Sequence, residues 1–295
     1  MEVILGRTSG FCGGVRNAIV KTKEEAEKSN DIIYCLGDLV HNPIVLNDLK
    51  RMGVQVIEKL EGIPNPKGKL VIIRAHGVKK EIYEEAKQLE IKIKDLTCPK
   101  VLAIHEFVDK YSGENSFIFL IGEKKHPEVI GTASFCGNNS VVIENEEELQ
   151  DAIDIFNNKS KENKNMNLIV VAQTTFNLEK FEEFEKIIKD KIDKNIEVIV
   201  NNTICNATRI RQEETEKIAK EVDGMVIIGG RKSSNTNKLY QISLENCKNV
   251  VMVENAQELK ENLDNFKMCK KIGIMAGAST PEESIEEIVN IVKNM

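Results

Sequence analysis

The chain has 295 residues, 41% of them hydrophobic, which is enough for one large core or for two to three small ones and excludes disorder as the main state. Its 41 basic and 47 acidic side chains give a formal net charge of −6, which disfavours nucleic acid and membrane surfaces as partners. No signal peptide opens the chain and no apolar run approaches the ~18 residues of a membrane span, so we expect a cytoplasmic protein.

Three blocks with the same order of expected elements follow one another along the chain. Each block opens on a cysteine that a helical pattern follows directly; these are Cys12, Cys98 and Cys205. A short apolar run ending in glycine comes next and is typical of a buried strand; these glycines are Gly37, Gly122 and Gly229. The cysteine-to-glycine distances are 25, 24 and 24 residues, a regularity that indicates an internal repeat.

Polar residues follow the strands of every block at matching places. Four residues beyond the glycines lie His41, His126 and Ser233. A second helix and strand come next, and each block closes on a third apolar strand that ends in small polar residues. Those terminal residues are His76, Thr174 and Ser279. Since ligands gather beyond the carboxyl ends of parallel strands, the repeat predicts three equivalent corners of one site.

Strands that alternate with helices imply right-handed βαβ units and parallel sheets. We therefore expect an α/β fold of three pseudo-threefold-related lobes, each a small, mainly parallel sheet flanked by helices, around a central site. The strand before Cys98 and the strand before Cys205 should complete the preceding lobe's sheet, and the N-terminal EVIL should complete the third sheet. The expected lobes are 14–95, 96–190 and 191–280, the last completed by residues 1–13 and a helix over 281–295.

The three repeated cysteines are candidate metal ligands. Helix N-termini favour the thiolate form, and pseudo-threefold symmetry would bring the three sulfurs to one axis. Structural zinc sites use four protein ligands and often C-x2-C pairs, and this chain has no such pair. A 4Fe-4S cluster held by three cysteines leaves one iron open for chemistry. The other cysteines are expected to be packed residues; they are Cys35, Cys136, Cys247 and Cys269.

The strand-end corners offer groups suited to an anion. Three of the four histidines lie there, at His41, His76 and His126. A helix begins at SSNTN, where Ser233, Ser234 and Asn235 are either simple N-caps or part of a cradle in which backbone N–H groups bind phosphate. Ser279 in AGAST offers the same geometry.

Glu128, Thr174 and His105 are considered separately. Glu128 in HPEV is an exposed acid in the first turn of a helix or, if it faces the axis, the natural proton donor. Thr174 could relay that proton. His105 falls in the middle of a helix and is expected to be a surface or packed residue.

Nine short motifs carry a resemblance to a known family. They are GFCGGVRNAI, DLVHNP, AHGV, LTCP, HPEV, AQTT, TICNAT, SSNTN and AGAST, and they span residues 10–280. Together they resemble the LytB/IspH family, the 4-hydroxy-3-methylbut-2-enyl diphosphate reductases of the methylerythritol phosphate route to isoprenoids.

The resemblance implies a 4Fe-4S cluster with three ligands, Cys12, Cys98 and Cys205, and an open iron that binds the substrate's terminal hydroxyl. Two electrons and protons remove that hydroxyl as water, giving isopentenyl and dimethylallyl diphosphate. A ferredoxin or flavodoxin is the implied electron donor. The implied ligands of the diphosphate are His41, His76, His126, Ser233, Ser234, Asn235 and Ser279. Thr174 would lie near the hydroxyl, and Glu128, Thr174 and His126 would form the catalytic group.

Two other functions stay open. A three-lobed cluster enzyme of the quinolinate synthase type, which carries out a dehydrating condensation, resembles the architecture, but its motifs do not occur here. A non-catalytic zinc or iron-sulfur module acting as a redox sensor is the second alternative. It leaves Glu128, Thr174 and the Ser233 corner without a role.

Overall fold

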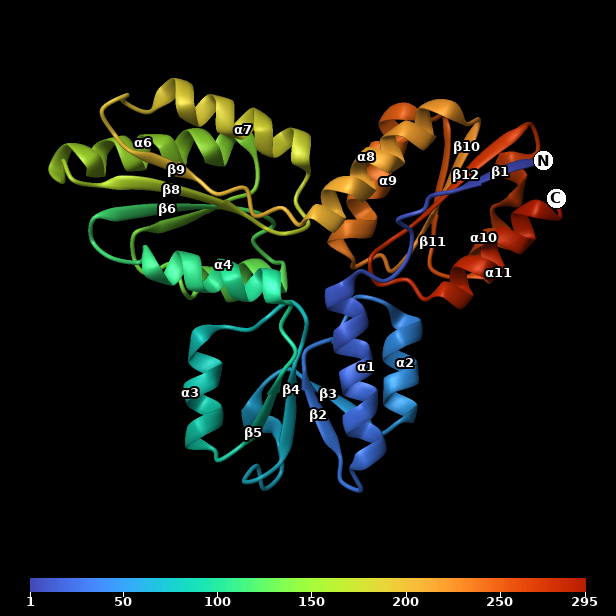
Figure 1. Ribbon diagram of the computed structural model, residues 1–295, viewed down its shortest axis with the longest axis horizontal. Coiled ribbons are helices and arrows are strands. Elements are labelled where there is room, and N and C mark those ends of the chain that lie inside the picture. Colours follow the sequence, from blue (N-terminus) through green and yellow to red (C-terminus); the bar gives the residue numbers. More distant parts are fainter. The chain divides into compact units, whose positions relative to one another are not determined.

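The computed structural model describes residues 1–295, the whole chain, and its strands form three four-stranded sheets (Figure 1). The first sheet has the order β3-β2-β4-β5, with β2 Ile33–Leu36, β3 Val54–Ile57, β4 Leu70–Ile73 and β5 Lys92–Asp95. The second has the order β7-β6-β8-β9, with β6 Ser116–Ile121, β7 Ser140–Ile143, β8 Asn167–Ala172 and β9 Val198–Val200. The third has the order β11-β10-β12-β1, with β10 Gly224–Ile228, β11 Asn249–Val253, β12 Lys271–Ala276 and β1 Glu2–Leu5.

The strand orders are the same in all three sheets when the strands are counted from β2, β6 and β10 and the N-terminal β1 is counted as the last strand of the third sheet, which confirms the predicted repeat. β5 pairs in parallel with β4, and β9 pairs in parallel with β8, so the strand before each of these cysteines completes the preceding sheet. The N-terminal β1 pairs in parallel with β12 and completes the third sheet, as expected.

Helices connect the strands and flank the sheets. In the first block they are α1 Gly13–Lys28, α2 Pro43–Arg51, the 3-10 turn η1 Leu60–Gly62 and α3 Lys80–Gln88. In the second they are α4 Pro99–Lys110, α5 Pro127–Ala133, α6 Glu146–Glu162 and α7 Leu178–Lys191. In the third they are α8 Asn206–Glu221, α9 Ser234–Asn246, α10 Ala256–Glu261, η2 Leu263–Phe266 and α11 Glu282–Lys293. No helix combines the length and the apolar character that a membrane span needs.

The central strands are uninterrupted apolar runs because both faces of each sheet are covered. In β6, Phe117 and Phe119 pack with α6 and α7 on one face, whereas Ile118 and Leu120 pack with α4 and α5 on the other. Figure 1 shows α6 and α7 on one side of this sheet and α4 on the opposite side. Full burial of such side chains stabilises the fold by ~1.5–3 kcal/mol each, so these runs make the sheets a firm base for the loops at their ends.

The chain divides into two compact units. One comprises Met1–Ile33, Asp38–Val56 and Asn206–Met295, and the other comprises Tyr34–Gly37 and Ile57–Cys205. The expected lobe boundary at residue 190 falls at the end of α7, and β9 still belongs to the second sheet. The second sheet therefore continues past the expected boundary, as far as Val200.

The glycines of the repeat fix the turns that follow the first strand of each block. In every block the glycine N–H donates to the last carbonyl of the neighbouring edge strand: Gly37 to Ile57 at 2.8 Å, Gly122 to Ile143 at 2.9 Å and Gly229 to Val253 at 3.0 Å. The same hydrogen bond thus ends the first strand in all three blocks, four residues before His41, His126 and Ser233.

Candidate active site

The three repeated cysteines occupy equivalent positions in their blocks. Each donates its backbone N–H to a carbonyl just past the third strand of a block: Cys12 to Ala278 at 3.1 Å, Cys98 to Ala75 at 3.0 Å and Cys205 to Thr174 at 3.0 Å. Cys12 is the N-cap of α1, Cys98 is the N-cap of α4, and Cys205 directly precedes α8. The predicted positions at helix N-termini are therefore confirmed.

Burial separates these cysteines from the others. Cys12, Cys98 and Cys205 are partly exposed, whereas the remaining cysteines are buried, as expected; these are Cys35, Cys136, Cys247 and Cys269. Partly exposed thiols can bind a metal, because a ligand sulfur has to be accessible to the ion. The buried ones behave as small apolar residues.

Two histidines meet at the corner beyond β4 and β6. The rings of His76 and His126 pack edge to face with centroids 5.4 Å apart. His126 is the N-cap of α5, and its Nδ1 accepts a hydrogen bond from the backbone N–H of Glu128 at 3.2 Å. This hydrogen bond assigns the proton of the neutral His126 ring to Nε2, the nitrogen that can then donate to an anion.

Glu128 is 3% exposed, so the interpretation as an exposed acid is wrong, and its role as a proton donor stays a prediction. Its carboxyl group accepts hydrogen bonds from the Thr174 backbone N–H at 2.6 Å and from Thr174 Oγ1 at 2.7 Å. Burial raises the pKa of Glu128 to about 7, although both bonds from Thr174 act in the opposite direction. A carboxyl group with such a pKa can hold a proton at neutral pH and donate it to a leaving oxygen on which negative charge develops.

These contacts form an unbroken series within one compact unit. Its members, in order of contact, are Cys98, Ala75, His76, His126, Glu128, Thr174 and Cys205. The structure thus links two of the proposed metal ligands through the histidines and the acid that the sequence placed at the same site.

The start of α9 lies in the other unit and presents a polar corner. Ser233 is the N-cap, and its hydroxyl accepts from the Thr236 N–H at 3.3 Å, a bond that uses the hydroxyl oxygen only as an acceptor. Ser234 and Asn235 are 3% and 4% exposed. Both polar atoms of the Asn235 amide are buried without a hydrogen-bond partner, an arrangement that is costly unless a ligand supplies the partner.

His41 and Ser279 come together in this same unit. The Ser279 hydroxyl lies 3.4 Å from the His41 carbonyl oxygen, to which it donates. Gly230 lies so near that a Cβ added there would be 2.3 Å from this oxygen, so only glycine fits. His41 differs from His126 in one respect: Asn42, not His41, is the N-cap of its helix, and Asn42 Oδ1 accepts from the N–H groups of Ile44 and Val45.

Gln173, a residue of the AQTT motif with no predicted role, lies at the corner of His126 and Thr174. Its Oε1 accepts from the Glu123 N–H at 2.9 Å and its Nε2 donates to Thr175 Oγ1 at 2.8 Å. A Cβ at Gly122 would lie 2.9 Å from Cβ of Gln173. Gln173 thus holds the loop that leads to His126, and only its place beside Thr174 hinted at such a role.

His105 packs beside the turn of Gly77, the residue after His76. It is 3% exposed and stacks on Phe135 with ring centroids 4.3 Å apart, which makes it a packed residue. Burial lowers the pKa of His105 to about 4, so the ring is neutral at physiological pH.

Replacing Gly77 with alanine should destabilise that turn by ~1–3 kcal/mol, the cost of a left-handed backbone in a residue with a side chain. Gly77 has a φ of 77°, and an added Cβ would lie 2.9 Å from His105 Cε1. Urea denaturation of the full chain measures the loss. Alanine at Gly113, where a Cβ meets nothing within 4 Å, is the matched control and should change the free energy of unfolding much less. Equal effects of the two changes would contradict the special role of the turn.

Comparison with known proteins gives this geometry a family. The family described as LytB protein matches residues 3–293. The chain belongs to the LytB family. It is 39% identical over 297 residues to the 4-hydroxy-3-methylbut-2-enyl diphosphate reductase of Clostridioides difficile (strain 630), with all of both chains covered. It is 40% identical over 299 residues to the enzyme of that name from Aquifex aeolicus (strain VF5), covering 100% of this chain and 97% of the relative.

Solved structures agree with the family assignment. The E-1-hydroxy-2-methyl-but-2-enyl-4-diphosphate reductase from Plasmodium falciparum matches with a TM-score of 0.88 and 32% identity, over 99% of this chain and 88% of that one. A structure of (E)-4-hydroxy-3-methyl-but-2-enyl diphosphate reductase, the terminal enzyme of the non-mevalonate pathway, matches with a TM-score of 0.68 and 39% identity over the full length of both chains. The α/β fold with three parallel-sheet lobes is thus that of the family.

Proposed function

We propose that this chain is a reductase that converts 4-hydroxy-3-methylbut-2-enyl diphosphate into isopentenyl and dimethylallyl diphosphate. The observation that carries the proposal is the buried Glu128 carboxyl group, hydrogen-bonded to Thr174, beside His76 and His126. Loss of an allylic hydroxyl as water needs a proton at the leaving oxygen, and this is the kind of group that supplies one. The family and the names of its relatives agree with this reaction.

The chemistry of the cysteines fits an iron-sulfur cofactor. Cys12, Cys98 and Cys205 are the partly exposed thiols of the chain, and each lies at the start of a helix. We propose that they hold a 4Fe-4S cluster as its three protein ligands, with one iron left open. When bound, this cluster supplies the two electrons of the reduction. A ferredoxin or flavodoxin type carrier is the proposed source of those electrons.

Neutral donors and histidines are proposed to bind the diphosphate, which explains how a chain of net charge −6 can hold an anion. They are His41, His76, His126, Ser233, Ser234, Asn235 and Ser279. The N-terminus of α9, a helix of 13 residues, adds the positive end of its dipole. The buried, unpaired amide of Asn235 supports a ligand at this place.

Glu128 and Thr174 are proposed to handle the proton. With a pKa near 7, Glu128 is protonated in a large fraction of the molecules at neutral pH. Thr174 Oγ1 is hydrogen-bonded to Glu128. When Glu128 is protonated, the Thr174 hydroxyl can accept its proton and give its own hydrogen to the hydroxyl of the substrate. The C–O bond breaks as two electrons and two protons are taken up, and water leaves.

Changing Asn235 to alanine should weaken binding of the allylic diphosphate by ~10- to 100-fold, the effect of losing a hydrogen bond to a charged group. The same change should leave the free energy of unfolding nearly unchanged or raise it, because the amide lacks a partner in the free protein. Calorimetric titration and urea denaturation measure the two effects. Asn237→Ala is a matched control on the same helix, since its amide donates to the Arg231 carbonyl. Wild-type affinity in Asn235→Ala would remove this residue from the binding site.

An oxygen-free assay tests the proposed function. Protein reconstituted with iron and sulfide, and supplied with a reduced low-potential dye, should convert 4-hydroxy-3-methylbut-2-enyl diphosphate into the two five-carbon diphosphates. Cluster-loaded protein that leaves this substrate intact would overturn the proposal. Turnover of the substrates of quinolinate synthase, or a single zinc without sulfide, would favour the alternatives.

A further inference from the structure

The loop that delivers Cys12 is built from residues 6–11, between β1 and α1, and we call it the Cys12 loop. Two hydrogen bonds join it to β12: the Gly6 N–H donates to the Ile274 carbonyl at 2.9 Å, and Ser9 Oγ accepts from the Ala276 N–H at 3.1 Å. The rest of its backbone depends on other contacts. Its glycines pack closely: a Cβ on Gly6 would lie 1.9 Å from Met275 Sδ, and Gly10 has a φ of 95°. A loop with these constraints cannot shift without disturbing Cys12, whose N–H is bonded to Ala278.

Glu214, in the middle of α8, binds the backbone of this loop. Its Oε1 accepts from the Arg7 N–H at 2.8 Å. Its Oε2 accepts from the Thr8 N–H at 2.9 Å and from Thr8 Oγ1 at 2.5 Å. Burial acts to raise the pKa of Glu214, but the hydrogen bonds from Thr8 and Arg7 hold that pKa below its usual value, so the carboxylate is charged at neutral pH.

Arg211, one helical turn earlier on the same face of α8, binds the loop carbonyls. Its Nε and Nη2 donate to the Thr8 oxygen at 2.9 and 2.6 Å, and its Nη2 also donates to the Gly10 oxygen at 2.9 Å. Arg211 is 4% exposed. Arg211 and Glu214 thus satisfy both donors and acceptors of the loop through charge-assisted bonds, which are about twice as strong as neutral ones.

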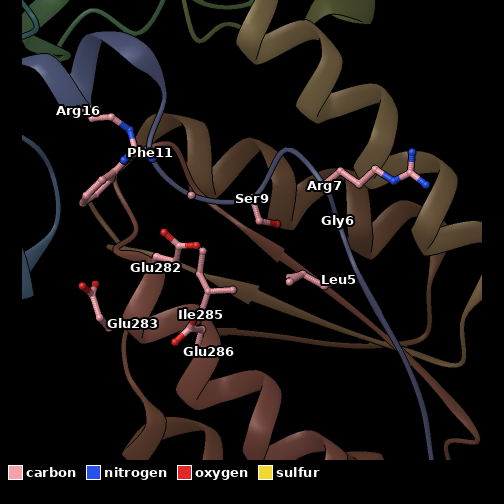
Figure 2. A pocket seen from close by; sticks show the side chains of 11 residues that line it. Leu5, Gly6, Arg7, Ser9, Phe11, Arg16, Glu282, Glu283, Ile285 and Glu286 are labelled. Carbon is pink, nitrogen blue, oxygen red and sulfur yellow. The ribbon is translucent and has the colours of Figure 1, made fainter.

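On another side the loop borders open space. A cavity of about 510 Å³ is lined by Ser9 and Phe11 of the loop and by Glu282 and Glu286 of α11. In Figure 2 the Arg7 side chain is directed away from these glutamates. Packing against α11 is close only near Gly10, where an added Cβ would lie 3.2 Å from Ile285 Cδ1. The backbone at Arg7, Thr8 and Gly10 is held on the other side by the charged contacts from α8.

We propose that Arg211 and Glu214 are positioning residues for the Cys12 thiolate. They hold the Cys12 loop so that the sulfur keeps the orientation required of a cluster ligand. The inference rests on the proposed function, in which Cys12 is such a ligand. α8 begins at the residue after Cys205. The same helix therefore follows one proposed ligand, Cys205, and holds the loop that leads to a second, Cys12.

The first experiment uses the full chain without cluster and measures the rate at which iodoacetamide alkylates Cys12, resolved by peptide mass spectrometry. Cys98, in the same chain, is the internal reference. Glu214→Gln and Arg211→Lys should raise the Cys12 rate by about 10-fold or more, the effect of losing a hydrogen bond to a charged group, and leave Cys98 unchanged.

The chain offers matched controls for both changes. Arg209 and Glu213 form an exposed ion pair on the same helix, at 2.8 Å, so Arg209→Lys and Glu213→Gln make the same chemical changes without touching the loop. These controls should keep the wild-type rate. A milder pair is available at Thr8: Thr8→Val removes the hydroxyl bond to Glu214 at similar volume, and Thr8→Ser restores it.

The second experiment loads the cluster and records its electron spin resonance spectrum and midpoint potential. A change in ligand orientation should alter the spectrum and shift the potential in Glu214→Gln and Thr8→Val, with recovery in Thr8→Ser. A residue that only stabilises the fold would move neither property.

Three outcomes decide the inference. Selective acceleration at Cys12 supports it, whereas equal acceleration at Cys12 and Cys98 shows general destabilisation and overturns it. Unchanged alkylation and unchanged spectra in folded variants overturn it as well. If the wild-type chain binds no cluster, the proposed function fails, and the alkylation rates still report whether α8 holds the loop.

Discussion

Replacing Glu128 with glutamine is expected to lower kcat by ~10²- to 10⁴-fold, the contribution of a general acid, while cluster content and substrate affinity stay near wild type. Glutamine is nearly isosteric and can still accept from the Thr174 N–H, which bonds to Glu128 at 2.6 Å, so the corner should keep its shape. What the variant loses is a transferable proton. Anaerobic turnover, iron content and calorimetric binding measure the three properties.

The pH profile of the wild-type enzyme should carry the same signature. Burial raises the pKa of Glu128 to about 7, so the acid is protonated below that pH and loses its proton above it. The value of kcat/KM should therefore fall about tenfold per pH unit above pH 7, because it reports groups of the free enzyme. In Glu128→Gln this limb should vanish.

Glu146→Gln is the matched control, since Glu146 also lies in the first turn of a helix but is exposed. It should leave kcat unchanged. Near-normal turnover in Glu128→Gln, or a profile with the same alkaline limb, would exclude Glu128 as the proton donor.

Changing Cys98 to serine should remove the cluster. Serine keeps the size and the backbone contact to Ala75 but lacks a thiolate, the ligand that iron-sulfur clusters require. Iron and sulfide should fall to a small fraction of the wild-type content, and turnover should fall with them. Anaerobic metal analysis and the visible absorbance of the purified variant measure this loss.

Cys247→Ser provides the control for cysteine chemistry. Cys247 Sγ lies 3.7 Å from the Val222 carbonyl oxygen and 3.9 Å from that of Asn249, so a serine hydroxyl would find an acceptor there. This variant should keep its iron. Unchanged iron in Cys98→Ser would overturn the assignment of Cys98 as a ligand.

The sequence was informative about the fold because the repeat has a strict spacing. Matching distances from each cysteine to the next glycine identified the first strand of each block, and the apolar runs of β6, β8 and β12 are long enough to be recognised without structure. The expected pairing of β1 with β12, which closes the third sheet across the whole chain, followed from the same logic and is confirmed. The three-lobe boundaries stay a prediction.

Candidate site residues could be predicted from the sequence where they follow a strand at the same position in each repeated block. The separation of Cys12, Cys98 and Cys205 from the buried cysteines agrees with the repeat. The role of Glu128 could not be decided, because a first-turn acid is normally solvated and only its burial against Thr174 distinguishes the two interpretations.

The contacts of Arg211 and Glu214 with the Cys12 loop could not be predicted from the sequence. Their bonds to Thr8 join residues more than 200 positions apart, and the run RIRQEE has the composition of a solvent-exposed helix face. The closely packed Gly6 and the left-handed Gly10 gave the only local sign that the Cys12 loop is tightly held, and glycine alone does not identify its partner.

The most direct test of the account is an anaerobic count of iron and sulfide, combined with an electron spin resonance spectrum recorded with and without the allylic diphosphate. A 4Fe-4S cluster held by three cysteines should give about four iron and four sulfide per chain. Its spectrum should change when the diphosphate binds near the iron that no side chain coordinates. One zinc without sulfide, or a full cluster whose spectrum ignores the diphosphate, would contradict the account.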